Sequence, residues 1–219
     1  MNRLDVIRKF SNCKAYQLLE QDLVKTFDYV EPVAQNQKTY SHRFFEIILR
    51  AGTEFENVCK QILTENGFSQ HKIDKSDIVT YFDIIKDFEL YEYVFFSPLL
   101  NDWTMPGWLG ANLCPYMIWQ GFANYDDLIT DCKTNNWKHW YQIYNEVKHN
   151  RETKFELANL ENAVFSVVAL GALLCSQYGM DTFDPYKEVA FYHTDENDND
   201  FITQTIWKVS HPESMPKSF

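Results

Sequence analysis

The spacing of apolar residues between Tyr40 and Gly67 is the feature that most limits how this chain folds. Ser41 is well placed to cap the start of a helix, and Asn66–Gly67 is a pair that commonly ends one. Between these ends, apolar side chains recur every three or four residues and so line one face of an α-helix: Phe44, Ile47, Ile48, Ala51, Phe55, Val58, Cys59 and Ile62. The segment predicts a long amphipathic helix, which needs a core to pack against.

The same spacing predicts further helices at residues 3–29, 76–88, 136–149 and 157–178. The first ends before Pro32, because the residue preceding a proline is pushed out of the α region. The apolar run at residues 163–179 is shorter than the roughly 20 residues that span a membrane, so we expect a buried helix. With only seven glycines and seven prolines, the composition also favours long regular segments. We therefore expect a mainly α-helical domain over residues 1–178.

Two parts of the chain lack helical spacing. Residues 90–124 hold three prolines, three glycines and three tryptophans, and we expect an irregular aromatic-rich insertion there with a strand at 91–96. The tryptophans (Trp103, Trp108 and Trp119) are open to two interpretations, as platforms for stacking bases or as a cap on the helical core. Residues 179–219 include the acidic run TDENDND and are predicted to form a C-terminal appendage, with a strand at 201–209.

The formal charge of −11 is unevenly distributed along the chain. An acidic surface disfavours non-specific binding to nucleic acid or to anionic membranes. Residues 133–154, however, hold five Lys or Arg against two Asp or Glu, a balance of +3. The rest of the chain keeps 15 basic against 29 acidic side chains. A locally basic segment on an acidic protein is what a confined anion site requires.

Several classes of site are excluded by missing motifs. The chain has no GxxxxGK[ST], GxGxxG, GxSxG or HExxH pattern, so we expect no cofactor and no metal. The run DENDND lacks the glycine and the final glutamate of a calcium loop. The N-terminus shows no secretory signal, and five scattered cysteines without a CxxC pair are typical of thiols in a reducing compartment. We therefore expect a cytoplasmic protein without a membrane segment.

Candidate functional residues gather at the end of the helix predicted over 136–149. On a helix, Asn145, Lys148 and His149 lie on one face, and Arg151 follows directly. Together they would suit a phosphodiester, with His149 moving a proton near neutral pH and the two cations offsetting phosphate charge. The alternative is structural, because Lys, Arg and His near a helix C-terminus each stabilise the helix dipole by ~0.3–1 kcal/mol.

Two more residues are candidates for contacting a substrate. Tyr144 lies in an aromatic stripe of this helix, so its hydroxyl either donates to a phosphate or is buried in the core. Glu54, on the helix predicted over 41–66, either pairs with Lys148 or His149 or is a solvated helix acid.

The segment WYQIYNEVKHNRETKFELANLENAVFSVVALGALL resembles the signature region of HEPN-type domains. It contains a helix carrying Y-N-x-x-K-H-x-R, followed by a helix that opens with A-N-L and continues with small and apolar residues. The upstream segment from Phe27 to Leu63 is similar to the first long helices of some HEPN-like proteins. The resemblance covers roughly residues 20–66 and 137–178, and it implies a helical bundle that often dimerises through the motif-bearing helices.

In active HEPN members the resemblance implies metal-independent RNA cleavage by an R-x4-H motif. The histidine helps to activate the ribose 2′-hydroxyl, and the arginine braces the phosphate. Here His149 matches the histidine, Asn145 occupies the polar position after the arginine, and Tyr144 stands where the arginine is expected. Arg151 is the cation that would replace it from another direction. Lys148 does not reproduce the bidentate geometry of an arginine.

Two functions follow from these expectations. In the first, a homodimer binds RNA or a nucleotide and acts as a metal-independent endoribonuclease of a defence or toxin–antitoxin system, with His149, Asn145 and Arg151 in the chemistry and Lys148, Tyr144 and Glu54 as substrate contacts. In the second, the chain is a non-catalytic HEPN-like module for dimerisation or for binding a protein partner. Exposure of His149 and Asn145 favours the first, and burial of both favours the second.

Overall fold

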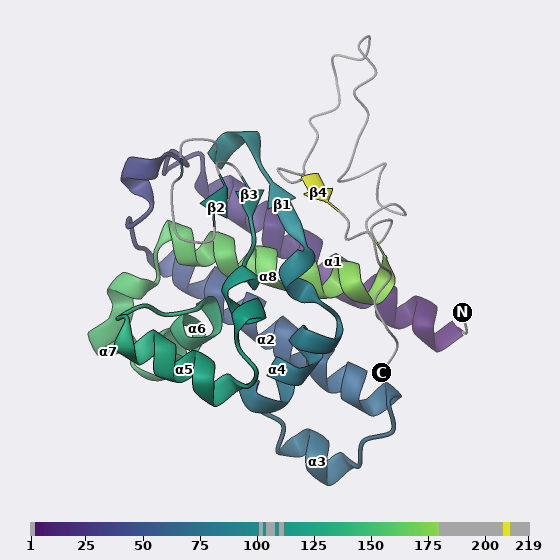
Figure 1. The fold of residues 1–219 in the computed structure, drawn as a ribbon. Helices are drawn as coiled ribbons and strands as arrows, with labels where there is room; N and C mark the ends of the chain where they lie inside the picture. Colours follow the sequence, from purple (N-terminus) through teal and green to yellow (C-terminus); the bar gives the residue numbers. More distant parts are fainter. Residues whose placement is uncertain (1–2, 101–102, 104–107, 110–111, 180–207, 211–219) are drawn as a thin grey trace.

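The computed structural model describes residues 3–100, 103, 108–109, 112–179 and 208–210 (Figure 1). The described part is mainly α-helical, as the sequence predicts. Its eight α-helices are α1 (Arg3–Thr26), α2 (His42–Glu65), α3 (Gln70–Asp74), α4 (Ile78–Asp87), α5 (Tyr125–Thr134), α6 (Trp140–His149), α7 (Arg151–Lys154) and α8 (Leu160–Tyr178). Short 3-10 turns and strands connect them.

Helix α8 forms the centre of the core. Figure 1 shows it running through the middle of the molecule, and it packs most extensively against α2, followed by α1 and α6. Gly171 allows this close packing, because a Cβ at that position would lie 2.9 Å from the Phe95 ring and from the Tyr16 hydroxyl. By length and composition α8 is apolar enough to cross a membrane, but 89% of its most apolar 18-residue stretch is buried inside the protein. The prediction of a buried core helix is confirmed.

Helix α2 agrees closely with its prediction. The Ser41 Oγ accepts a hydrogen bond of 3.1 Å from the backbone N–H of Phe44, which is the expected N-cap. The helix ends at Glu65, and Gly67 follows with φ of +76°. All eight residues of the predicted apolar stripe are buried.

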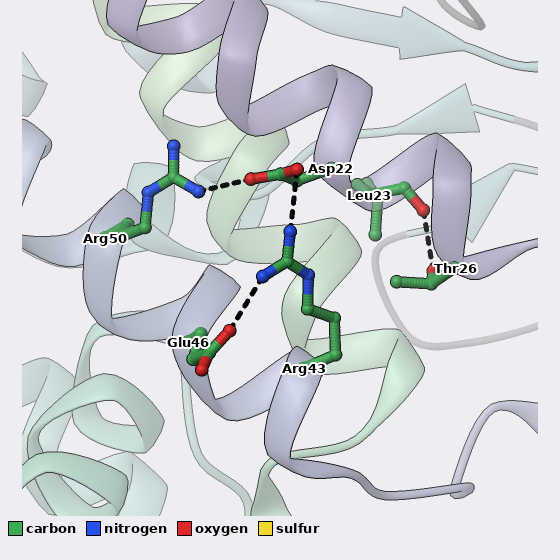
Figure 2. Close-up of polar contacts among 6 residues, drawn as sticks. All are labelled: Asp22, Leu23, Thr26, Arg43, Glu46 and Arg50. Atoms are coloured by element: carbon green, nitrogen blue, oxygen red, sulfur yellow. Dashed lines mark hydrogen bonds and ion pairs between the residues drawn. The ribbon is translucent and has the colours of Figure 1, made fainter.

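Ion pairs join α1 to α2 on the surface, as Figure 2 shows. Asp22 on α1 lies between Arg43, at 2.7 Å, and Arg50, and Arg43 also contacts Glu46 at 2.8 Å. Hydrogen bonding to Glu46 is the largest of the effects that raise the pKa of Arg43. Such half-exposed pairs are worth little singly, but a shared carboxylate fixes two arginines at once. The charges of both arginines are therefore compensated.

The first helix ends earlier than predicted, at Thr26 rather than Tyr29. The Thr26 hydroxyl donates to the carbonyl of Leu23 over 2.6 Å (Figure 2), and residues 27–30 form a turn before Pro32. Pro32 restricts only Glu31 directly, so the end of α1 at Thr26 coincides with this turn and not with the proline.

The segments that lead into α2 and α8 lie side by side. The backbone N–H of Ser41 donates to the carbonyl of Ala158 over 3.0 Å, and the N–H of Leu160 donates to Thr39 over 2.9 Å. A β-bridge pairs Tyr40 with Asn159 between these bonds. This backbone clamp brings the first residues of α2 next to the segment after α7.

An ion pair supports the same clamp. Glu161, in the first turn of α8, is buried and pairs with the exposed Lys38. Burial is the largest effect on this carboxyl and raises its pKa, while the Lys38 ammonium lowers it. The charge of Lys38 is therefore also compensated.

The irregular insertion supplies three short strands of a small sheet, of which only the first was predicted, and the C-terminal segment supplies the fourth. β1 (Val94–Phe96), β2 (Trp108–Leu109), β3 (Asn112–Leu113) and β4 (Lys208–Ser210) form an antiparallel sheet in the order β2-β3-β1-β4. β1 pairs Phe95 with Leu113 on one side and with Val209 on the other. The predicted strand at 91–96 begins only at Val94, because a 3-10 turn occupies Leu90–Glu92.

Part of the predicted C-terminal appendage thus joins the sheet through β4. This strand overlaps the expected strand at 201–209 in its last two residues and extends one residue further, to Ser210. The rest of residues 180–219 lies outside the described residues.

Two of the three tryptophans of the insertion belong to the core. Trp103 and Trp119 are fully buried, the Trp103 Nε1–H donates to the carbonyl of Pro32 over 2.9 Å, and Trp119 stacks on Phe82 at a centroid distance of 5.8 Å. Their buried faces are not available to a base. The side chain of Trp108 lies outside the described part.

Helix α5 was not predicted. It begins with Asn124, whose Oδ1 accepts from the N–H of Asp127 over 3.0 Å. Only Leu128 and Cys132 of its residues are buried. Two apolar positions are too few to register as a periodic face, although the cap and the acidic first turn were visible signals.

Candidate functional site

Helix α6 carries the predicted site, and its start is set by a histidine. The helix begins at Trp140 rather than Asn136, because Asn136 has φ of +53° and His139 forms the cap. The His139 Nδ1 accepts from the N–H of Gln142, and the Gln142 side chain accepts from the N–H of His139, each at 3.3 Å. This reciprocal cap sets the residue at which α6 begins.

The apolar stripe expected at Trp137, Trp140, Tyr141, Tyr144 and Val147 is buried except at Trp137, which precedes the helix and is half-buried. For Tyr144, which the sequence left open, burial in the core is the outcome. Tyr144 is fully buried, so the position at which the HEPN motif carries arginine faces the core. Gly52 on α2 makes room for it, since a Cβ on Gly52 would lie 2.3 Å from Cδ2 of the Tyr144 ring. The ring therefore rests directly on the backbone of α2.

Lys148 closes over the Tyr144 hydroxyl. Its Nζ donates to the Tyr144 hydroxyl over 2.9 Å and lies 4.9 Å from the ring centroid. It also lies 3.9 Å from Oε1 of Glu56, which accepts from the Tyr141 hydroxyl over 2.8 Å. The hydrogen bond to Tyr144 is the largest effect that raises the pKa of Lys148. Lys148 therefore already interacts with Tyr144 and Glu56 of the same chain.

The carboxylate near Lys148 is that of Glu56 and not that of Glu54, for which the sequence left two alternatives, pairing with Lys148 or His149 and a solvated helix acid. Gly52, Phe55 and Glu56 share the face of α2 that meets α6, whereas Glu54 points elsewhere and is half-buried. Two residues of separation turn a side chain by about 200° around a helix. The sequence did not show which face of α2 would meet α6, so Glu56 was missed.

His149 and Asn145 are not sealed inside the protein. His149 is the exposed last residue of α6, and Asn145 is half-buried one turn earlier. Within the part of the chain that the structure describes, neither side chain has a hydrogen-bond partner. Exposure of these two residues was the observation expected to favour the RNA-binding function over the non-catalytic module, and the His149 imidazole is accessible.

Arg151 is held by rings instead of by a carboxylate. Its Cζ lies 4.6 Å from the Phe45 ring centroid and 6.0 Å from that of Phe155, and its Nη2 contacts Nδ1 of His42 at 3.0 Å. A guanidinium group only donates, so His42 Nδ1 accepts and the ring proton of neutral His42 lies on Nε2. No carboxylate of the described residues lies within ion-pair distance of Arg151.

This arrangement distinguishes Arg151 from the basic residues that form ion pairs with acids among the described residues, which are Lys38, Arg43, Arg50, Lys138 and Lys148. Arg151 is exposed and uses one of its five N–H donors on His42, so the remaining donors are available to a bidentate anion. His42 and Phe45 were missed from the sequence because only the clamp between Tyr40 and Asn159 brings α2 to this position.

The predicted residues thus separate into two clusters. Lys148 and Tyr144 lie with Glu56, while Arg151 lies with His42 and Phe45, and His149 stands between them in the chain. The first cluster is internally neutralised. The second presents a fixed positive group to solvent, which is suited to a phosphate.

Other parts of the described structure offer less. A hollow of about 430 Å³ at the end of α1 is lined by Asp28, Glu31 and neighbouring residues, and two carboxylates disfavour an anion there. Among the described residues no group of three His, Cys, Asp or Glu is placed to hold a metal ion. All five cysteines lie in the described part, and each is a buried thiol rather than half of a disulfide.

Comparison with known proteins adds no relative: no protein-family model, no curated protein and no solved structure matches this chain.

Proposed function

We propose that this chain is an HEPN-like helical protein that binds RNA or a nucleotide through the end of α6 and through α7. The observation that carries the proposal is the position of Arg151, which rests on Phe45, donates to His42 and meets no carboxylate among the described residues. A stacked guanidinium is pre-organised, and its remaining N–H groups match two phosphate oxygens. In this proposal Arg151 holds a phosphate, and Lys148, whose charge is offset by Glu56, is a secondary contact for the substrate.

The catalytic form of the proposal is a metal-independent endoribonuclease of a defence or toxin–antitoxin system, acting as a cytoplasmic homodimer. His149 would take the proton from a ribose 2′-hydroxyl, Arg151 would offset the phosphate charge, and Asn145 would position the substrate. The exposure of His149 supports this form, since a proton-transfer group has to reach its substrate. Glu54 and Tyr144 stay candidate substrate contacts of this form.

One observation favours the second candidate function, a non-catalytic module for dimerisation or for a protein partner. Tyr144 occupies the position of the motif arginine, and it is fully buried against Gly52 with Lys148 on its hydroxyl. A core residue at this position supplies packing and no phosphate contact. In this function the α6 surface sets the geometry between subunits.

A binding assay on labelled single-stranded RNA tests the proposal. We expect Arg151→Ala to weaken binding at least tenfold at low salt, because a charge-assisted bidentate contact is worth roughly 1.5–3 kcal/mol. Lys138→Ala is the matched control: it removes one positive charge from the same basic segment, but Glu146 already compensates that charge. It should change affinity less than threefold. Equal losses in the two variants would mean that overall charge, and not the Arg151 site, binds the RNA.

Cleavage is read in parallel by incubating the same RNA with the wild type and His149→Ala in the presence of a chelator. If the protein is an endoribonuclease, the wild type should degrade the RNA, and the rate of decay should be at least 100-fold lower in the variant, as expected for loss of a general base. Binding without decay, together with a dimer in sedimentation, would leave the non-catalytic module. Equal decay by both proteins would remove His149 from the chemistry.

A further inference from the structure

Aromatic side chains surround the Arg151 guanidinium at the surface. The Phe155 ring lies 4.7 Å from His42, 5.8 Å from Tyr40 and 6.2 Å from Phe45, measured between ring centroids. Tyr40 meets Phe155 edge to face and keeps 56% of its surface exposed. His42 is exposed as well. We call Tyr40, His42, Phe45 and Phe155, with Arg151 among them, the aromatic–arginine platform.

Packing in the core explains only part of this platform, because some of its aromatic surface is exposed to solvent. Phe45 and Phe155 pack against the core with part of their surface, whereas Tyr40 stands among the most exposed large apolar side chains of the described residues. Several aromatic rings gathered beside an exposed cation without a carboxylate partner form a contiguous surface that is suited to recognition. The platform therefore calls for a ligand with both a flat apolar face and negative charge.

The platform is also held in shape by the backbone. The bonds from Ser41 to Ala158 and from Leu160 to Thr39 flank the bridge at Tyr40, so the two chain segments that carry the rings are fixed relative to each other. Arg151 is fixed in turn by its contacts with Phe45 and His42. A pre-organised surface loses little conformational entropy when it binds.

We propose that the aromatic–arginine platform stacks an unpaired base of single-stranded RNA, with Tyr40 as the outer ring and Arg151 holding an adjacent phosphate. This inference rests on the proposed function and names its substrate class. Base faces are open to an aromatic ring only where the strand is unpaired, and stacking of this kind tolerates any base. Neutral His42 carries its proton on Nε2, which adds a donor beside the phosphate position.

Three RNA probes of equal length separate the base from the phosphates: a single strand, the same strand with abasic sites at its centre, and a blunt duplex. The full chain is titrated with each probe by fluorescence anisotropy, as wild type, Tyr40→Ala and Tyr40→Phe. Tyr40 is suitable because its backbone forms the bridge while its side chain is largely exposed, so the variants should keep the fold. Circular dichroism and the unfolding midpoint check this.

We expect the wild type to bind the single strand at least fivefold more tightly than the abasic strand or the duplex. Tyr40→Ala should lose roughly tenfold in affinity for the single strand and little for the abasic strand, and Tyr40→Phe should bind like the wild type, because it keeps the ring. Arg151→Ala should weaken binding to the single strand and to the abasic strand.

Other outcomes overturn the inference in distinguishable ways. If the wild type binds intact and abasic strands equally and Tyr40→Ala changes nothing, while Arg151→Ala still loses affinity, the phosphate site stands and the base platform is wrong. If no probe binds, the proposed function fails together with the inference. If Tyr40→Ala alters self-association but not RNA binding, the platform is a contact between copies of this chain and the inference is wrong.

Discussion

Replacing Gly52 by alanine is expected to destabilise the fold by roughly 3 kcal/mol, a large loss for a single methyl group. The new Cβ would lie 2.3–2.6 Å from three atoms of the Tyr144 ring, distances that real Cβ atoms do not adopt. The ring has little room to move, since it is fully buried, lies 5.4 Å from Tyr141 and is covered by Lys148 at its hydroxyl. Either α2 and α6 separate or Tyr144 leaves its rotamer.

Urea unfolding measures this loss, with Gly121→Ala as the matched control. A Cβ on Gly121 meets no atom within 4 Å, so that substitution should change the free energy of unfolding by less than about 1 kcal/mol. A double-mutant cycle adds a stricter requirement. In a Tyr144→Ala background the alanine at position 52 occupies space vacated by the ring, so Gly52→Ala should cost at least 1 kcal/mol less there than in the wild type. Additive effects would show that the two residues do not meet.

The sequence predicted those parts of the fold in which one face is apolar over many turns. α2 satisfies this condition, and its cap at Ser41, its buried stripe and its end near Gly67 were all confirmed. Helix α5 fails it, because most of its residues are exposed and its position depends on a cap and two apolar contacts. The short strands of the insertion fail it as well, since each has only two or three residues and is defined by pairing with other segments, which for β1 include residues more than 100 positions away.

The residues of the candidate site also differ in whether local spacing could predict them. Side chains on α6 could be assigned to a common face from their spacing, and the exposure of His149 and the burial of Trp140 agree with that spacing. The partners supplied by α2 could not, because Glu56, His42 and Phe45 reach α6 and α7 only through tertiary packing. Local periodicity gives the angle of a side chain around its own helix, and it does not give the rotation of the neighbouring helix.

His139 leads to the second large effect, a loss of stability in mild acid. The ring is buried against Trp119 at a centroid distance of 4.7 Å, and its Nδ1 accepts from the N–H of Gln142. Its remaining proton lies on Nε2, 3.4 Å from the Tyr125 hydroxyl. Protonation would place a charge in the core and break the cap, so burial lowers the pKa of His139 from its usual value of 6.5 to about 3.

The direction of the pH dependence follows from this lowered pKa. As the pH falls below 6.5, the unfolded chain takes up a proton at this position, whereas the folded chain does not until the pH approaches 3. The unfolded state therefore binds more protons in this window, and the fold loses roughly 1.4 kcal/mol for each pH unit, or about 3 kcal/mol between pH 7 and pH 4. Above pH 6.5 His139 is mostly neutral in both states, so the fold keeps this part of its free energy of unfolding.

His139→Asn isolates this contribution, because asparagine is a good N-cap that does not titrate in this range. The variant loses packing against Trp119 and should be less stable at pH 7, but its free energy of unfolding should fall less steeply with acid than that of the wild type. Carboxylates titrate in both proteins, so the difference between the two slopes belongs to position 139. Equal slopes, or a His139 ring signal that titrates near pH 6.5 in NMR spectra of the folded protein, would mean that the ring reaches water and that the cap of α6 opens readily.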